Sequence, residues 1–242
     1  MEVTLRSLIG ISREEHSVAA AESLRFAVEG AGEVSALLLR PQDAKWMMAL
    51  AHGAGAGMAH PFLAALAEEL SRVGVATLRC QFPYMEARRG RPDSPEVATA
   101  TVAAAVRVAA KAAGGLPVLA GGKSFGGRMT STAAAEGKLQ SARGLVFFGF
   151  PLHPPKRPGT KRAEHLSSVG QPMLFLQGTR DDLADLTLLR PICKALGQRA
   201  MLHVIDGADH SFHVLKKSGQ TDAGVLRELA GTTANWANAQ GA

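Results

Sequence analysis

Residues 116–127 of the chain read LPVLAGGKSFGG. An apolar run comes first, and Gly122-Lys123-Ser124-Phe125-Gly126 follows it in the order Gly-x-Ser-x-Gly. This order is typical of a strand that turns sharply into a helix with a serine at the apex, where a larger flanking side chain would collide with neighbouring backbone. We predict a strand over 116–120, a Gly-rich turn and a helix from about 126 to 135. An ordinary Gly-rich turn without chemistry is the alternative.

The residues on either side alternate short apolar runs with longer patterns of helical spacing. Further strands are expected over 23–29, 33–40, 46–51, 75–80, 145–150, 173–177 and 200–205. Further helices are expected near 62–70, 95–113, 186–196 and 225–236. Strands that alternate with helices form right-handed crossovers, so we expect an α/β fold, a three-layer α/β/α sandwich with a mainly parallel central sheet. The first two strands flank Gly30-Ala31-Gly32 and predict an antiparallel N-terminal hairpin.

Two loops later in the chain carry residues that can activate the Ser124 hydroxyl. A serine hydroxyl is a poor nucleophile near neutral pH, so an imidazole must accept its proton and a carboxylate must orient that imidazole. The strand over 173–177 runs into Asp181 and Asp182, and the strand over 200–205 runs towards His210. Parallel strands present their carboxyl ends at one edge of a sheet. We therefore predict a triad of Ser124, Asp181 and His210, with Asp182 as the alternative carboxylate.

Two other histidines lie close to His210 in the sequence. His203 falls within an expected strand, where a structural role is favoured. His213 follows His210 by three residues, but no cluster of further ligands supports a metal pair. We expect neither a metal site nor a cofactor.

A substrate carbonyl oxygen that gains charge during acyl transfer needs preorganised N–H donors. The N–H of Phe125, directly after the serine, is one candidate. The other is expected from the loop 52–57, His-Gly-Ala-Gly-Ala-Gly, with Ala54 as the donor. A flexible loop or a phosphate-binding loop would be the alternative. The phosphate-binding loop fails because the glycines fall one residue short of Gly-x-Gly-x-x-Gly.

Four motifs occur in order along the chain. They are His52-Gly53-Ala54-Gly55, Gly122-Lys123-Ser124-Phe125-Gly126, Gly178-Thr179-Arg180-Asp181 and Gly207-Ala208-Asp209-His210. With these motifs the chain, from about residue 23 to its end, resembles the α/β-hydrolase superfamily. Within it, the chain is similar to lidless dienelactone-hydrolase-like proteins and small predicted bacterial serine hydrolases. Dienelactone hydrolases themselves use a cysteine nucleophile, and Ser124 in its place argues against that particular activity.

The resemblance implies a carboxylesterase-like acyl hydrolase that cleaves small soluble esters through an acyl-enzyme intermediate. Thioesterases, amidases and peptidases share this route, and a non-catalytic binding module of the same fold is the alternative from another class. His52, Gly53, Gly55 and His153 are the expected substrate-binding residues.

Many relatives insert a helical cap between the strands expected over 145–150 and 173–177. In this chain only about twenty residues join them, with Pro151, Pro154, Pro155 and Pro158 among them. We expect no large lid and an open site that favours soluble or short-chain acyl substrates. Basic residues of the segment are expected at its rim, where they would attract anionic groups: His153, Lys156, Arg157 and Lys161.

No Pro/Ser-rich or charged linker divides the 242 residues, of which 46% are hydrophobic. We expect a single α/β-hydrolase domain over 22–242, preceded by a tail or an added element over 1–21. The N-terminus lacks the apolar core of a signal peptide. The longest apolar stretch, 99–120, is interrupted by Arg107 and Lys111, so no membrane association is expected.

The formal net charge of +6 is concentrated in two loops, 88–91 and 156–162. Almost no aromatic residues are interleaved there, so surface charge is favoured over nucleic-acid binding. Cys80 and Cys193 lack the spacing of a metal or redox motif and are expected as buried free thiols in a cytoplasmic protein. The expected partner is a small acyl substrate, and a homodimer is left open.

Overall fold

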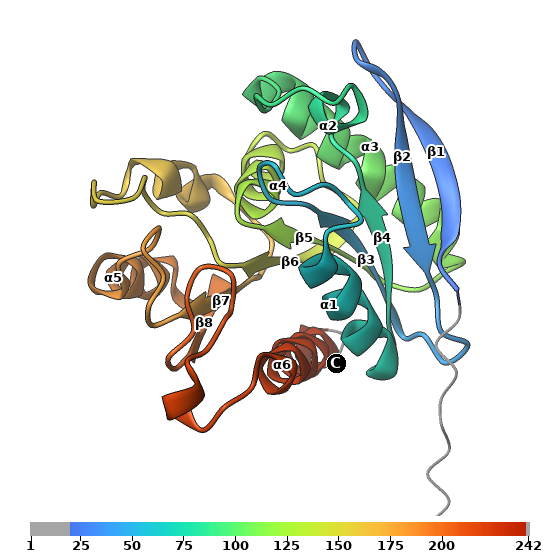
Figure 1. The fold of residues 1–242 in the computed structure, drawn as a ribbon. Helices are drawn as coiled ribbons and strands as arrows, with labels where there is room; N and C mark the ends of the chain where they lie inside the picture. Colours follow the sequence, from blue (N-terminus) through green and yellow to red (C-terminus); the bar gives the residue numbers. More distant parts are fainter. Residues whose placement is uncertain (1–19, 241–242) are drawn as a thin grey trace, which may run out of the picture.

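The computed structural model describes residues 20–240 of the chain (Figure 1). Each of the expected strands is present. They are β1 (Glu22–Val28), β2 (Gly32–Leu39), β3 (Trp46–Ala51), β4 (Val75–Cys80), β5 (Val118–Lys123), β6 (Ala142–Phe148), β7 (Met173–Gly178) and β8 (Ala200–Ile205).

These strands form one sheet in the order β1-β2-β4-β3-β5-β6-β7-β8. β2 pairs antiparallel with β1 and with β4. Every other neighbouring pair is parallel. The predicted sheet, mainly parallel with an antiparallel N-terminal hairpin, is confirmed, and β5 lies in its interior between β3 and β6.

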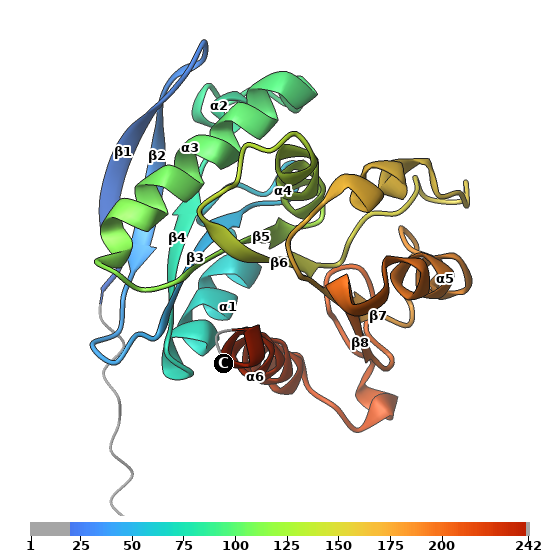
Figure 2. The same ribbon diagram turned by 180° about the vertical axis from the view of Figure 1, so that it is seen from behind.

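Helices cover both faces of the sheet. They are α1 (Pro61–Arg72), α2 (Pro83–Glu86), α3 (Pro95–Ala113), α4 (Phe125–Ala135), α5 (Leu186–Leu196) and α6 (Asp222–Gln240), with short 3₁₀ segments η1 (Lys161–Ser168), η2 (Gly197–Arg199) and η3 (Lys216–Ser218). α1 and α6 pack together on one face, and α3 and α4 pack together on the other (Figures 1 and 2). The three-layer α/β/α architecture is therefore the one predicted.

β3 shows how one strand serves two cores. All six of its residues are buried, as expected of a continuous apolar run inside a parallel sheet. Met47 and its alternate neighbours belong to the core on the side of α3 and α4. Trp46 and its alternate neighbours belong to the core on the side of α1 and α6. The period of two along the strand thus divides its side chains between the two helical layers.

The limits of α3 follow from its end residues. The Ser94 hydroxyl accepts a hydrogen bond from the Val97 N–H at 3.4 Å, and Pro95 occupies the first turn. Gly114 ends the helix in the left-handed conformation, with φ of 60°. The helix predicted over 95–113 is confirmed, and these end residues explain why its bounds could be predicted.

The central strand ends later than predicted. The apolar run indicates a strand over 116–120, whereas β5 runs from Val118 to Lys123 and pairs with both neighbours across its glycines. A Cβ on Gly121 would lie 2.5 Å from the Val146 carbonyl oxygen, and a Cβ on Gly122 would lie 2.6 Å from the Gly126 carbonyl carbon. These glycines are needed because other backbone packs directly on the strand, and the turn begins only at Ser124.

Other boundaries differ by a few residues. β6 ends at Phe148 instead of residue 150, because the chain leaves the sheet at Gly149 with φ of 69°. α6 is longer at both ends than the helix predicted over 225–236. α2 and η1 were not predicted, since segments this short show no clear helical periodicity.

The predicted N-terminal tail, 1–21, lies almost wholly outside the described residues. Ala20 and Ala21 carry no secondary structure and are exposed. The division into this tail and one domain over 22–242 stays a prediction. Within residues 20–240, no helix combines the length and the apolar character needed to cross a membrane.

Candidate active site

Ser124 lies at the junction of β5 and α4, with φ of 51° and ψ of −113°. Residues with a side chain rarely adopt such angles, and the surrounding packing must hold the strain. Gly126 shows why the turn needs glycine: a Cβ there would lie 2.5 Å from the carbonyl oxygen of Ala51 in β3. The sharp strand-to-helix turn is therefore present, and it places Ser124 at the carboxyl end of the sheet.

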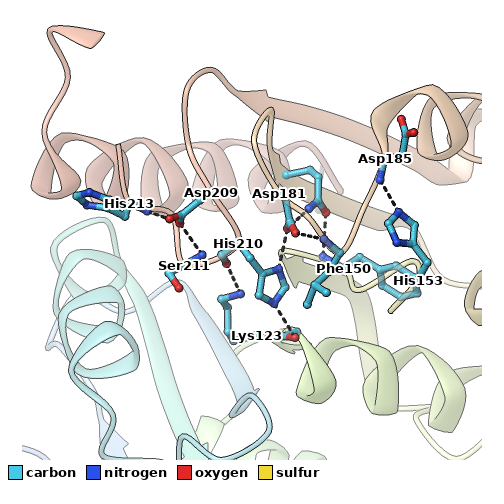
Figure 3. A network of polar contacts seen from close by, with 12 residues as sticks. Lys123, Phe150, His153, Asp181, Asp185, Asp209, His210, Ser211 and His213 are labelled. Atoms are coloured by element: carbon cyan, nitrogen blue, oxygen red, sulfur yellow. Dashed lines mark hydrogen bonds and ion pairs between the residues drawn. The ribbon is translucent and has the colours of Figure 1, made fainter. Parts of the chain in front are cut away.

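Three side chains from three separate segments meet at this edge. The Nδ1 atom of His210 lies 2.7 Å from Oδ2 of Asp181 (Figure 3). Its Nε2 atom lies 2.8 Å from Oγ of Ser124. A carboxylate only accepts, so Nδ1 carries the hydrogen and Nε2 is free to accept the serine proton. The arrangement has the geometry of a nucleophile, a general base and an orienting carboxylate.

The structure distinguishes the two candidate carboxylates by their contact with His210. Asp181 is buried in the loop after β7, and its side chain is 1% exposed. Asp182, the alternative, is exposed to solvent. The carboxylate that bonds to His210 is thus Asp181.

Asp181 is held by two donors that the sequence motif did not reveal. The N–H of Leu183 donates to Oδ1 at 2.8 Å, and the side-chain amide of Gln177 donates to Oδ2. The other end of the Gln177 amide accepts a hydrogen bond from the Phe150 N–H at 2.9 Å. These bonds fix the orientation of the carboxylate. The only signal in the sequence was a polar residue near the end of an otherwise apolar strand.

A pocket of about 330 Å³ opens beside the Ser124 hydroxyl. Its wall combines the glycine loop after β3, the start of α1 and the loops that carry the triad. The lining residues are Gly53, Ala54, Ala56, His60, Phe62, Leu63, Lys123, Ser124, Leu183, His210 and Ser211. The pocket is large enough for a small ligand and lies against the serine.

Of the two predicted N–H donors, Ala54 lines this pocket and Phe125 does not, although Phe125 is adjacent to Ser124. Phe125 directly follows the serine and begins α4, and Ala54 is exposed on the pocket wall. Among residues 20–240, no acceptor is hydrogen-bonded to the N–H of Ala54 or of Phe125. Both groups are therefore available to a ligand, and their role as oxyanion donors stays a prediction.

Two of the predicted substrate-binding residues in the glycine loop point elsewhere. His52 is fully buried, with Nδ1 donating to the Gly53 carbonyl at 2.7 Å and Nε2 accepting from the Phe82 N–H at 3.1 Å. The N–H of Gly55 donates to the Tyr84 hydroxyl at 2.9 Å. The prediction of substrate contact is therefore wrong for the His52 side chain, since it faces the protein interior. Gly53 does line the pocket.

His153 also has a structural environment. It is buried, its Nδ1 donates to the Pro154 carbonyl at 2.9 Å, and its Nε2 accepts from the Asp185 N–H at 2.9 Å (Figure 3). Both ring nitrogens are occupied by backbone groups, so the prediction that His153 contacts the substrate is wrong. The basic residues that follow it, Lys156, Arg157 and Lys161, are exposed and are not among those that line the pocket.

Buried charge at the site comes from Lys123, the last residue of β5. It is 9% exposed, and its Nζ atom donates to the carbonyl oxygen of His210 at 2.6 Å (Figure 3). Burial lowers the pKa of Lys123 to about 8, although the nearby Asp181 and Asp209 carboxylates favour the charged form. Sequence reasoning gave this residue no role.

His203 and His213, the two histidines close to His210 in the sequence, each pair with a single carboxylate. His203 contacts Glu228 at 2.7 Å, and His213 contacts Asp222 at 2.8 Å. The Asp222 hydrogen bond raises the pKa of His213. No group of three or more His, Cys, Asp or Glu side chains within residues 20–240 is placed to hold a metal ion.

Comparison with known proteins places this chain in a family. A family model described as an alpha/beta hydrolase domain matches residues 44–238. Dienelactone hydrolase from Anabaena variabilis aligns with a TM-score of 0.69 at 21% identity, covering 90% of this chain and 97% of that one. A serine hydrolase without a lid from Xanthomonas campestris gives 0.68 at 19%, covering 88% and 94%. An esterase domain from Rhodothermus marinus gives 0.64 at 17%, covering 90% and 99%. The structural likenesses show the shared fold, and from the family match the chain belongs to the alpha/beta hydrolase domain family.

Proposed function

We propose that this protein is a serine hydrolase that cleaves small ester substrates through an acyl-enzyme intermediate. The observation that carries the proposal is the continuous hydrogen-bonded line from the Ser124 hydroxyl through the His210 imidazole to the Asp181 carboxylate. Each group has the partner that its chemical role requires, and the serine faces a pocket.

Acylation begins when the Ser124 oxygen attacks the ester carbonyl carbon. His210 Nε2 takes the hydroxyl proton, and Asp181 stabilises the resulting imidazolium through Nδ1–H. The carbonyl oxygen becomes an oxyanion, and we expect it to accept hydrogen bonds from the N–H of Ala54 on the pocket wall and from the N–H of Phe125, directly after the serine. When the tetrahedral intermediate collapses, the bond to the alcohol oxygen breaks and His210 returns the proton to that oxygen.

Deacylation repeats the sequence with water as the nucleophile. His210 accepts a proton from water as the water oxygen attacks the acyl carbon. The bond between the acyl group and Ser124 then breaks, the carboxylic acid leaves, and the proton returns to the serine oxygen. No group other than the triad, water and the N–H donors is needed for this cycle.

The pocket favours a short acyl or alcohol group. Phe62 and Leu63 at the start of α1, together with Leu183, supply apolar surface. A volume of about 330 Å³ lies at the lower end of the range for small-molecule sites. Short-chain esters fill it, whereas long lipid chains extend beyond its walls.

Two alternatives remain distinct from this proposal. Thioesters and amides can follow the same acyl-enzyme route, and the leaving group decides between them. A binding module without catalysis is the alternative from another class, because the fold alone does not guarantee activity. The intact and correctly bonded triad favours catalysis.

The test is turnover of a panel of p-nitrophenyl esters from acetate to palmitate, with a thioester and an amide of the same acyl group. We expect the wild type to prefer acetate and butyrate over palmitate. Ser124→Ala should fold and show no turnover above the spontaneous rate, whereas Ser167→Ala, an exposed serine in η1, should retain wild-type activity. A folded wild-type protein that is inert towards the whole panel would contradict the proposal.

A further inference from the structure

Lys123 is a buried amine that the proposed mechanism does not use. Lysine is among the residues least often buried, because its ammonium loses hydration. Here it occupies the position before Ser124, at the end of a strand whose other residues are all apolar or glycine. A methionine or leucine would fill such a position without this cost, so the amine calls for an explanation.

The amine has a specific partner on the loop that carries the general base. Its Nζ atom donates to the carbonyl oxygen of His210 at 2.6 Å (Figure 3). β5 is an interior strand, and Lys123 is paired with Phe148 in β6. The bond therefore joins the loop after β8 to an interior part of the sheet, at the residue whose imidazole must face Ser124.

The groups around the amine belong to the triad and its supporting loops. A Cβ built on Gly149 would lie 3.0 Å from Lys123 Nζ, 3.5 Å from Asp181 Oδ2 and 3.5 Å from His210 Cε1. The amine, the carboxylate and the imidazole thus surround one small space, which the glycine leaves free of any side chain. Asp209 is the second nearby carboxylate, and the Phe212 ring lies 5.5 Å from Nζ.

We propose that Lys123 is a positioning residue for the general base, holding the His210 carbonyl so that the imidazole faces Ser124 and placing a positive charge beside the His210–Asp181 pair. This inference rests on the proposed function of the triad. Lys123 itself takes no proton from the substrate and forms no bond to it. Its hydrogen bond acts on geometry, and its charge acts on the protonation of the imidazole.

The two effects have different signatures. Loss of the hydrogen bond lets the His210 loop move, and a displacement of about 1 Å at a reacting group can lower kcat by about a hundredfold. Loss of the positive charge makes a protonated imidazole less unfavourable. The low-pH limb of the kcat/KM profile then moves to higher pH, because His210 must be neutral to accept the serine proton.

The experiment compares Lys123→Met, which removes the donor and the charge, with Lys123→Gln, which removes the charge and keeps an N–H donor on a side chain one atom shorter. Lys194→Met, an exposed lysine in α5, is the matched control. Steady-state kinetics with p-nitrophenyl acetate are measured from pH 5 to 9, with thermal unfolding of each variant and with active-site titration to count folded enzyme.

For Lys123→Met we expect kcat per folded enzyme to fall about tenfold to a hundredfold, with KM changed by less than about threefold. The low-pH limb should move up by about one pH unit in both Lys123 variants, and kcat should fall less in Lys123→Gln. Should Lys123→Met fail to fold, the pH profile of Lys123→Gln decides. Lys194→Met should match the wild type.

A Lys123 variant that has the wild-type kcat and the wild-type pH profile would overturn the inference. So would a variant that unfolds more easily while its folded fraction behaves as the wild type does, because that marks a purely structural lysine. A wild-type protein without esterase activity would instead contradict the proposed function itself, so the two failures are distinguishable.

Discussion

Two histidines at the carboxyl edge of the sheet, His52 after β3 and His210 after β8, have the same number of hydrogen bonds and different kinds of partner. Both ring nitrogens of His52 bond to backbone, the Gly53 carbonyl and the Phe82 N–H. Both ring nitrogens of His210 bond to side chains, Asp181 and Ser124. His52 is fully buried, whereas the side chain of His210 is 25% exposed and borders the pocket.

The type of hydrogen-bond partner, more than the number of hydrogen bonds, distinguishes a histidine that backbone groups hold in place from one that is placed to exchange a proton. A backbone N–H that donates to Nε2 leaves that nitrogen no place for a proton, and burial lowers the pKa of His52 to about 4. His210 faces a hydroxyl that can give a proton and a carboxylate that stabilises the resulting charge. Substitutions at the two sites should therefore act on different quantities.

The largest expected effect is on catalysis at His210. In His210→Ala the serine loses its general base, so kcat should fall by up to about six powers of ten. The melting temperature should change little, because the side chain is partly exposed and borders the pocket. Steady-state kinetics and thermal unfolding check this together. Retention of activity within tenfold of the wild type would show that His210 is not the base.

A smaller loss is expected for Asp181→Asn. The amide can donate a hydrogen bond where the carboxylate only accepted, which favours the wrong imidazole tautomer, and kcat should fall by about four powers of ten. Asp182→Asn is the matched control, since Asp182 is exposed. If Asp182→Asn lowers kcat more than Asp181→Asn does, the orienting carboxylate has been assigned incorrectly.

His52→Ala should act on stability. It leaves the Phe82 N–H and the Gly53 carbonyl without their buried partners, at about 2 kcal/mol each, so the free energy of unfolding should fall by about 4 kcal/mol. Urea denaturation measures this value, and active-site titration gives kcat for the folded fraction. We expect that kcat to fall by less than about tenfold. A catalytic loss as large as that of His210→Ala, without loss of stability, would remove the distinction between the two histidines.

The free energy of unfolding should also depend on pH because of His52. In the folded state the pKa of His52 is lowered from 6.5 to about 4. Between these pH values the unfolded chain binds a proton at His52 and the folded chain does not. The contribution of neutral His52 to the free energy of unfolding is therefore full above pH 6.5 and is lost as the pH falls to 4. The loss is about 3 kcal/mol. Urea denaturation from pH 4 to 7 should show a smaller loss in His52→Gln, and equal slopes in both proteins would argue against a buried neutral His52.

Much of the fold followed from the sequence because local signals agreed with one another. The apolar runs over 46–51 and 75–80 match β3 and β4, and Ser94, Pro95 and Gly114 set the ends of α3. The strand before Ser124 was placed too early, since its glycines indicate a turn when only local sequence is considered. The close approach of Val146 and Gly126 explains them, and that contact comes from elsewhere in the chain.

In the candidate site too, local sequence predicted where residues lie but not which distant residues contact them. The meeting of Ser124, Asp181 and His210 was predictable because each follows a strand whose carboxyl end must reach the same edge of the sheet. His52 and His153 were misassigned because the groups that occupy their rings, Phe82 and Asp185, belong to distant segments. Sequence motifs locate a residue on a loop, but they do not show what packs against that loop.

The central claim is that Ser124 is a nucleophile activated by His210. Its most direct test is stoichiometric labelling with a fluorophosphonate, followed by intact mass measurement and peptide mapping. We expect one adduct per molecule, located on Ser124, with labelling abolished in Ser124→Ala and strongly slowed in His210→Ala. A folded wild-type protein that takes up no label, or an adduct on another residue, would contradict it.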